Sequence, residues 1–351
     1  MLTDIFATRY RERPLFEKFG EDEARLLVQA YRIVDEQIFR YYGPDKKIDE
    51  WAKLNWSTIH DKLTMELGVK ELSSRTYNIK STWAGVETHQ THWYNMNLVC
   101  ESWLCRVPNT KDLDRHMKER ISFIELAFRE REDGLKTINA KLPMLLAVAE
   151  MTDKRPRTIT NLPGSRVAAV NEGNAKLNDA FRQSVHELNV RFEQARTPLN
   201  YHNGFIQITT DALTQKQIDQ PFWALVKDPK WVNVDIDMKE AVDRRDTAGR
   251  DPAFYAAKAL ESTIKIICKE KAWETGNEKG ASDWLNHLEK KANGPFVASW
   301  ERELMQRFFG GVRNEFGHGP GGEKMPELTE AQTDYAIEFC MSWTKSLIKR
   351  L

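Results

Sequence analysis

Apolar residues recur every three or four positions over most of this 351-residue chain, and this spacing constrains the fold more than any other feature of the sequence. Between Asp22 and Phe39 the apolar side chains follow it until Gly43-Pro44 ends the segment. Similar patterns begin near Asp49 and run through 83–105 and 113–131. The sequence therefore predicts a mainly α fold whose N-terminal part, residues 1–160, is a helical bundle.

A break in this periodicity between Thr152 and Gly164 predicts a domain boundary, because two prolines and a glycine replace the apolar repeats. A helix over 174–196 is expected after it, followed by two short strands on either side of Asn203-Gly204. Both of these residues tolerate the positive φ angles of a tight hairpin. We therefore expect a connecting segment, residues 161–245, that contains a helix and a small β-hairpin.

The last part, residues 246–351, opens with a strong helix start. Asp251 is placed as an N-cap, and Pro252 suits the first helical position. Four helices are expected, over 252–271, 282–293, 296–316 and 330–351, with glycine-containing breaks between them. This density predicts a C-terminal bundle of four to five helices.

Charge and composition limit the possible functions. The chain carries 52 Lys and Arg against 52 Asp and Glu, so no overall field would attract nucleic acid, and any RNA contact must be local. The one local basic cluster that we considered for RNA, which a solvated linker explains equally well, consists of Lys154, Arg155, Arg157 and Arg166.

The expected location is the cytoplasm, with no membrane partner. No apolar run approaches the roughly 20 residues that span a bilayer, and the N-terminus lacks the features of a signal peptide. The four cysteines are too scattered for a disulfide framework and suit a reducing compartment: Cys100, Cys105, Cys268 and Cys340.

The run Arg-Asn-Glu-Phe-Gly-His near the C-terminus is the best candidate for a catalytic site. On a continuous helix Arg313 and His318 would lie about 140° apart, so they would not share a face. Gly317 is well placed to end the helix in a left-handed conformation, which would turn His318 toward the groove faced by Arg313. The glycines around the pair, among them Gly310 and Gly311, would allow close approach of backbone or substrate.

Arginine with histidine suits RNA cleavage without a metal ion. A neutral imidazole can take the proton of the ribose 2′-hydroxyl, and a fixed guanidinium can hold the phosphate as its charge builds. The expected product end is a 2′,3′-cyclic phosphate. One histidine cannot act as base and acid at once, so a homodimer that supplies two, in a composite site, is mechanistically attractive.

These residues resemble the ribonuclease motif of HEPN domains of the abortive-infection type, in which an arginine, a polar residue, a short spacer and a histidine follow one another. Arg313, Asn314 and His318 occupy those positions. The resemblance extends to the first helix of the domain, where Glu261 and Lys265 match a recurring glutamate and lysine near the site. It implies that Asn314 orients the catalytic pair and that Glu261 orients Arg313 or Lys265 contacts phosphate, whereas a plain surface ion pair is the alternative for Glu261 and Lys265.

The segments 4–11 and 189–208 are similar to AbiJ-like phage-defence proteins. This resemblance implies an endoribonuclease toxin that stops phage spread by damaging transfer or messenger RNA, with a regulatory or sensing role for the N-terminal domain, residues 1–160. Because the sequence contains no P-loop, we expect any trigger to come from a partner protein, a phage product or a small molecule. A non-catalytic HEPN module that binds a nucleotide or a protein, as a sensor or adaptor, is the alternative function that the sequence leaves open.

Neither a cofactor nor a metal site is expected. His89, His92, Cys100 and Cys105 could ligate zinc, but their spacing does not fit the paired ligands of structural zinc sites. No P-loop sequence is present. The tryptophans between Trp83 and Trp103 could stack bases or bind a partner, although core packing is the interpretation that we favour.

Overall fold

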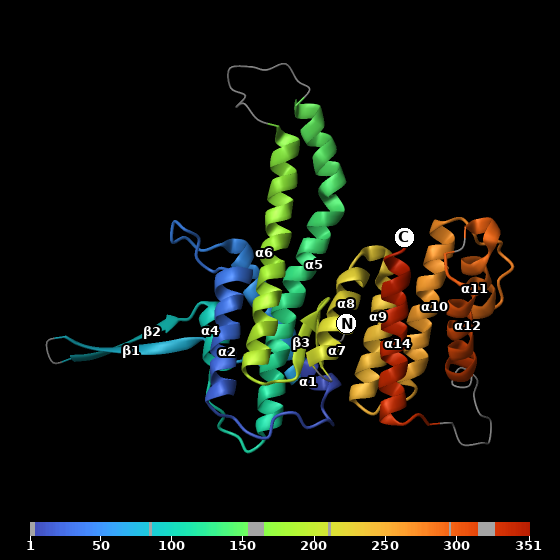
Figure 1. Ribbon diagram of the computed structural model, residues 1–351. Helices are drawn as coiled ribbons and strands as arrows, with labels where there is room; N and C mark the ends of the chain where they lie inside the picture. Colours follow the sequence, from blue (N-terminus) through green and yellow to red (C-terminus); the bar gives the residue numbers. More distant parts are fainter. Residues whose placement is uncertain (1–3, 84–85, 154–164, 210–211, 295, 315–326) are drawn as a thin grey trace. The chain divides into compact units, whose positions relative to one another are not determined.

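The computed structural model describes residues 4–83, 86–153, 165–209, 212–294, 296–314 and 327–351, and the chain divides into two compact units, Met1–Ile206 and Gln207–Leu351 (Figure 1). The elements of the first unit are α1 (Phe6–Arg9), α2 (Glu21–Ile33), the π-helix η1 (Val34–Ile38), α3 (Glu50–Leu67), β1 (Thr76–Trp83), β2 (Val86–Trp93), α4 (Met96–Leu104), α5 (Leu113–Asp153), α6 (Arg166–Gln194) and β3 (Leu199–His202). The division falls within β4 (Phe205–Ile208).

The second unit is helical after β4. Its elements are α7 (Ala212–Thr214), the π-helix η2 (Gln215–Asp219), α8 (Gln220–Val226), the 3-10 helix η3 (Pro229–Trp231), α9 (Val232–Asp246), α10 (Pro252–Glu270), α11 (Ala281–Glu289), the 3-10 helix η4 (Lys291–Asn293), α12 (Ser299–Phe308), the π-helix η5 (Phe309–Asn314) and α14 (Glu330–Ile348). The mainly α fold is confirmed, since the only described sheets are the antiparallel pairs β1–β2 and β3–β4.

Two long helices organise the first unit. α5 and α6 pack against each other along their length, and α1, α2 and α3 pack on the same pair (Figure 1). The core between them is aromatic, with Trp56, Phe123 and Phe128 fully buried. Burial of each such side chain stabilises the fold by about 1.5–3 kcal/mol.

The predicted helix over 83–105 is wrong for its first half. Residues 76–83 and 86–93 form the antiparallel pair β1–β2, in which Thr76 pairs with Trp93, and of the described residues in this range only Met96–Leu104 is helical. β-branched and aromatic residues favour this outcome, because threonine, tyrosine and isoleucine suit a strand. The preference for core packing of the tryptophans is also wrong for Trp93, whose side chain is 72% exposed, but Trp103 is buried.

The hairpin β3–β4 agrees with the sequence prediction. Asn203 and Gly204 connect the strands with φ angles of 43° and 88°. Of the predicted connecting segment, 161–245, α6 and β3 lie in the first compact unit and α7 to α9 in the second.

α10 is the central helix of the second unit, in contact with α9, α11, α14 and η5. Its apolar side chains are buried on most sides, Leu260, Ile264 and Ile267 among them. The helix begins after Asp251 as predicted. Asp251 is the N-cap residue, as predicted, but it lies in the left-handed region with φ of 57° and its side chain makes no capping hydrogen bond.

Among the described helices, none combines the length and the apolar character that crossing a bilayer requires. The four cysteines are free thiols, and three of them are buried.

Candidate functional site

The predicted motif follows α12 on a widened helical turn. Instead of continuing to residue 316 as an α-helix, α12 changes at Phe309 into the π-helix η5, which carries the backbone of Arg313 and Asn314. Single π turns within helices occur frequently at functional sites. The side chains of Arg313 and Asn314, and the whole of Gly317 and His318, lie outside the described part of the structure.

Gly310 and Gly311 form the first turn of η5 and are exposed. A methyl group added at either position would meet no described atom within 4 Å, so packing within the described chain does not require glycine there. The predicted close approach of another part of this chain is therefore not seen among these residues. The pair leaves an open patch of backbone one turn before Arg313.

α10 packs against η5 and carries the two predicted supporting residues. Glu261 is buried, with 4% of its surface exposed, and its Oε1 lies 2.8 Å from Nζ of Lys265, one turn later. The lysine side chain is 46% exposed. Burying a carboxylate destabilises a fold unless the charge is paired, so the ion pair with Lys265 favours this buried position of Glu261. The ammonium group of Lys265 reaches solvent.

A second ion pair on α10 has nearly the same geometry. Nζ of Lys258 lies 2.8 Å from Oδ1 of Asp237 on α9, with the lysine side chain 51% exposed and the aspartate 9% exposed. Its lysine also lies over the ring of Tyr255. This pair joins α10 to α9, whereas Glu261 and Lys265 lie one turn apart on α10. Because the distance and the exposures are nearly the same, it provides a matched comparison for Glu261 and Lys265.

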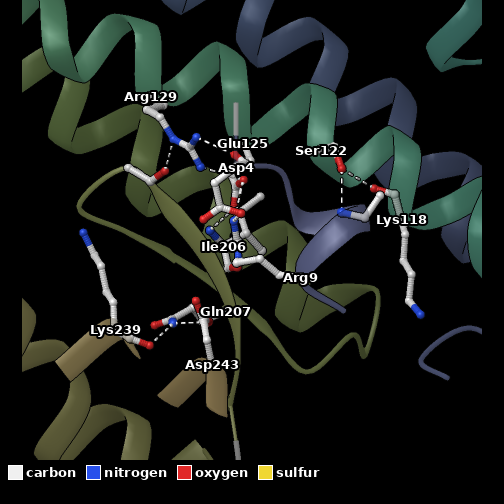
Figure 2. A network of polar contacts seen from close by, with 12 residues as sticks. Asp4, Arg9, Lys118, Ser122, Glu125, Arg129, Ile206, Gln207, Lys239 and Asp243 are labelled. Atoms are coloured by element: carbon white, nitrogen blue, oxygen red, sulfur yellow. Dashed lines mark hydrogen bonds and ion pairs between the residues drawn. The ribbon is translucent and has the colours of Figure 1, made fainter. Parts of the chain in front are cut away.

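The sequence did not predict a buried polar network in the first unit (Figure 2). Glu125 on α5 is fully buried and accepts hydrogen bonds from the guanidinium groups of Arg9 on α1, at 2.5 Å, and Arg129, at 2.8 Å. The backbone N–H of Ile206 donates to the same carboxylate at 2.7 Å. Both guanidinium groups also lie over the ring of Phe205, with their carbons 4.8 Å and 4.6 Å from its centroid.

This network anchors the N-terminal segment and the β3–β4 hairpin to α5. Arg9 also donates to the carbonyl oxygen of Ile206, and Arg129 donates to those of Gly204 and Asp4. Immediately after Ile206, in the second unit, the side chain of Gln207 donates to the carbonyl oxygen of Lys239 and to Asp243 (Figure 2). Of the residues in this network, Arg9 and the hairpin itself lie in segments 4–11 and 189–208, which carried the family resemblance, whereas Glu125 and Arg129 lie on α5.

The zinc alternative has no support among the described residues, where no group of three or more metal-binding side chains occurs. His89 and His92 lie three apart on β2, so they point to opposite faces of the strand pair. Cys100 is buried in α4, and burial raises the pKa of its thiol. Of the basic cluster, only Arg166 is described, at the start of α6.

Residues 4–224 match the family described as AbiJ N-terminal domain 4, and residues 239–351 match the family described as a HEPN-like domain. The first match covers more than half of the chain, and together the two confirm the resemblance seen in the sequence. Neither the curated proteins nor the solved structures include a significant match to this chain.

Proposed function

Because the chain belongs to the AbiJ N-terminal domain 4 family and ends in a HEPN-like domain, we propose that this abortive-infection protein is a metal-independent endoribonuclease. The observation that carries the proposal is the position of the motif: Arg313 and Asn314 lie on a π turn that packs against α10, the helix that carries the buried Glu261. π turns and buried charges both concentrate at functional sites.

In the proposed reaction, His318 takes the proton of the ribose 2′-hydroxyl, whose oxygen then attacks the adjacent phosphorus. Arg313 holds the phosphate as negative charge builds on it, and the bond to the 5′-oxygen of the next nucleotide breaks. A proton from the second histidine of a homodimer completes the leaving hydroxyl. The products are a 2′,3′-cyclic phosphate and a 5′-hydroxyl, so the reaction needs no metal ion and no cofactor.

Glu261 acts as a positioning residue in this proposal. Its buried carboxylate on α10 lies in the helix that η5 packs against, and it orients Arg313, while Asn314 orients the catalytic pair. Lys265 keeps its ammonium group exposed and contacts phosphate of the bound RNA, transfer or messenger. A phage product or a partner protein that acts on the N-terminal unit supplies the trigger.

The test is RNA cleavage by the purified full chain in the presence of a chelator, compared with Arg313→Ala and His318→Ala. We expect cleavage by the parent chain and a loss of about 10³-fold or more in each variant, because both groups act on the reacting atoms. Undiminished cleavage in both variants would remove the site assignment. Absence of cleavage over varied RNAs, together with nucleotide binding that both variants lose, would instead favour the non-catalytic binding module.

A further inference from the structure

The far half of the α5–α6 helix pair extends beyond the other helices of the first unit (Figure 1). Every residue of these two helices is described, and the buried residues of α5 lie between His116 and Leu135, apart from Ala149. On α6 the first buried residue is Phe181. We call residues 136–153 of α5 together with residues 166–180 of α6 the distal hairpin.

One side of α5 in the distal hairpin is both apolar and exposed. Met144, Val148 and Met151 are 62%, 57% and 68% exposed, and Leu145 is 43% exposed. Residues three, four and seven positions apart lie on the same side of a helix, so these four side chains form one stripe, which we call the Met144 stripe. A contiguous exposed apolar surface of this kind marks an interaction site.

The neighbouring part of α6 leaves room for a partner helix. The side-chain amides of Asn139 and Asn178 donate to each other at 3.0 Å, which sets the register of the two antiparallel helices. Because both helices rise by the same amount per residue, the Met144 stripe is level with residues 166–173 of α6. Ala169 and Gly173 in that range are exposed, and a methyl group added at Gly173 would meet no described atom within 4 Å. Such small residues let a neighbouring helix come close.

A protein helix fits this surface better than RNA or a lipid bilayer does. Methionine, leucine and valine offer no aromatic ring on which a base could stack. Asn171 and Glu172 on α6 and Glu150 on α5 are exposed at the level of the stripe, so the distal hairpin is polar on its other sides and does not suit a bilayer interior. A helix that lies along one side of α5 needs only the apolar stripe.

Charge indicates the chemistry of the partner helix. Residues 136–180 contain seven Lys and Arg against four Asp and Glu, whereas the whole chain is neutral. Lys141, three residues before Met144, is exposed at one end of the stripe, and Arg166 is exposed on α6 at the level of the other end. Of the acidic groups there, the carboxylate of Asp153 accepts hydrogen bonds from backbone N–H groups at the start of α6. An acidic partner is therefore complementary to this surface.

We propose that the Met144 stripe binds an amphipathic helix with an acidic polar side, which a partner protein supplies. The apolar side of that helix packs on Met144, Val148 and Met151, and its acidic residues lie near Lys141 and Arg166. Methionine side chains are flexible and adapt to the shape of a bound surface, which suits a docking site. With the partner bound, the distal hairpin becomes a bundle of three helices.

One consequence rests on the proposed function, in which a trigger acts on the N-terminal unit. α5 carries the Met144 stripe in its far half and the buried Glu125 in its other half. Glu125 holds α1 and the β3–β4 hairpin, after which the chain enters the second unit at Gln207. A single helix thus links the docking surface to the segment that leads to the HEPN-like domain, and the partner that docks there is the trigger.

Fluorescence anisotropy with a synthetic helix tests the surface. The probe is a labelled peptide of about 20 residues, long enough to form a helix, with leucines along one side and glutamates elsewhere. We expect the full chain to bind it with a micromolar dissociation constant, and Val148→Glu or Met144→Glu to weaken binding about 10-fold or more, because each places a charge among the apolar contacts. Leu54→Glu is the matched control, since Leu54 on α3 is 65% exposed and lies outside the distal hairpin. No binding by the parent, or equal affinities for the parent and both stripe variants, would overturn the proposal.

A second peptide tests the charge. Lysine in place of each glutamate should weaken binding to the parent chain about 10-fold, and Lys141→Glu should reduce the difference between the two peptides. Equal affinities of the parent for the two peptides would overturn the assignment of an acidic partner.

The other ligands are tested with the same variants. If the parent binds an RNA oligonucleotide or phosphatidylglycerol vesicles but not the peptide, and Val148→Glu abolishes that binding, the proposal is overturned in favour of that ligand. RNA cleavage is measured on the same samples. Peptide binding that the stripe variants lose, in a chain that cleaves no RNA with or without the peptide, supports the docking surface and contradicts the proposed function.

Discussion

Glu125 in the first unit and Glu261 in the second are both buried, and the two glutamates have different surroundings. Glu125 in the first unit is fully enclosed between two arginines and the N–H of Ile206. Glu261 in the second unit is buried to almost the same extent, but its partner Lys265 is half exposed and its helix packs against the π turn of the motif.

These surroundings indicate a stabilising role for Glu125 and a role in positioning a catalytic group for Glu261. A carboxylate that is fully buried and bonded to three donors ties elements together and has no contact with solvent through which a substrate could reach it. A carboxylate that pairs with a half-exposed cation, on a helix that packs against a widened turn, can orient a group that meets a substrate. We therefore expect changes at Glu125 to affect unfolding and changes at Glu261 to affect catalysis.

The largest expected effect is on stability, at Glu125. Glu125→Ala leaves the guanidinium groups of Arg9 and Arg129 without their shared partner, which should lower the free energy of unfolding by about 3–5 kcal/mol. Urea denaturation measures it. Glu172→Ala, which breaks an exposed ion pair with Lys176 on α6, is the control and should change stability by less than about 1 kcal/mol. Equal losses in the two variants would contradict the structural role of the network.

The next effect is on catalysis, at Glu261. Glu261→Gln should lower the rate of RNA cleavage by about 10²-fold, because a displaced guanidinium no longer fits the transition state. Asp237→Asn is the matched control, since Asp237 is buried beside a lysine of α10 in the same way. Equal rates in the two variants would show that Glu261 does not position Arg313.

Acid should weaken the two units in different pH windows. Burial and the nearby charge of Arg120 lower the pKa of His116 in the first unit from 6.5 to about 4. The unfolded chain therefore binds the proton at a higher pH than the folded chain does. Stability is lost as the pH falls from 6.5 to about 4. Hydrogen bonds from Thr275 and His287 lower the pKa of Glu278 in the second unit from 4.5 to about 2, so its contribution is lost only between pH 4.5 and 2. Urea midpoints at pH 7, 5 and 3 measure both losses.

Substitutions assign each loss to its residue. His116→Leu should reduce the difference between pH 7 and 5, and Glu278→Gln should reduce only the difference between pH 5 and 3. A variant that keeps the full pH dependence of the parent would contradict the assignment of that window.

The smallest expected effect is that of replacing Lys265, the exposed partner of Glu261. Lys265→Ala and Lys258→Ala should each change stability by less than about 1 kcal/mol, because both lysines are half exposed. Only Lys265→Ala should weaken RNA binding. It should also reduce the number of counterions released on binding, obtained from the salt dependence of the affinity, by about one. Equal RNA affinity in the two variants would leave Lys265 as a plain surface ion pair.

Local signals in the sequence predicted much of the fold. Asn203-Gly204 predicted its hairpin because positive φ angles need those residues, and Pro252 predicted the start of α10. The strand pair β1–β2 was missed because its apolar and polar residues alternate only weakly. The resulting sequence pattern resembles that of a helix.

The candidate site was predictable only where its residues are close in sequence. Glu261 and Lys265 are one turn apart, and their ion pair follows from that spacing. Arg9 and Glu125 are separated by 116 residues, and no local pattern indicates that they meet. The π turn at Phe309 also has no sequence signal that we could use, although it determines how the motif leaves α12.

The chemistry of the C-terminal motif is the central claim, and the ends of the RNA fragments test it most directly. RNA cut by the purified chain in chelator should carry 2′,3′-cyclic phosphate and 5′-hydroxyl ends, as identified by mass spectrometry, because the 2′-oxygen is the nucleophile. Fragments with 3′-hydroxyl ends, or cleavage that stops when divalent ions are removed, would contradict the account.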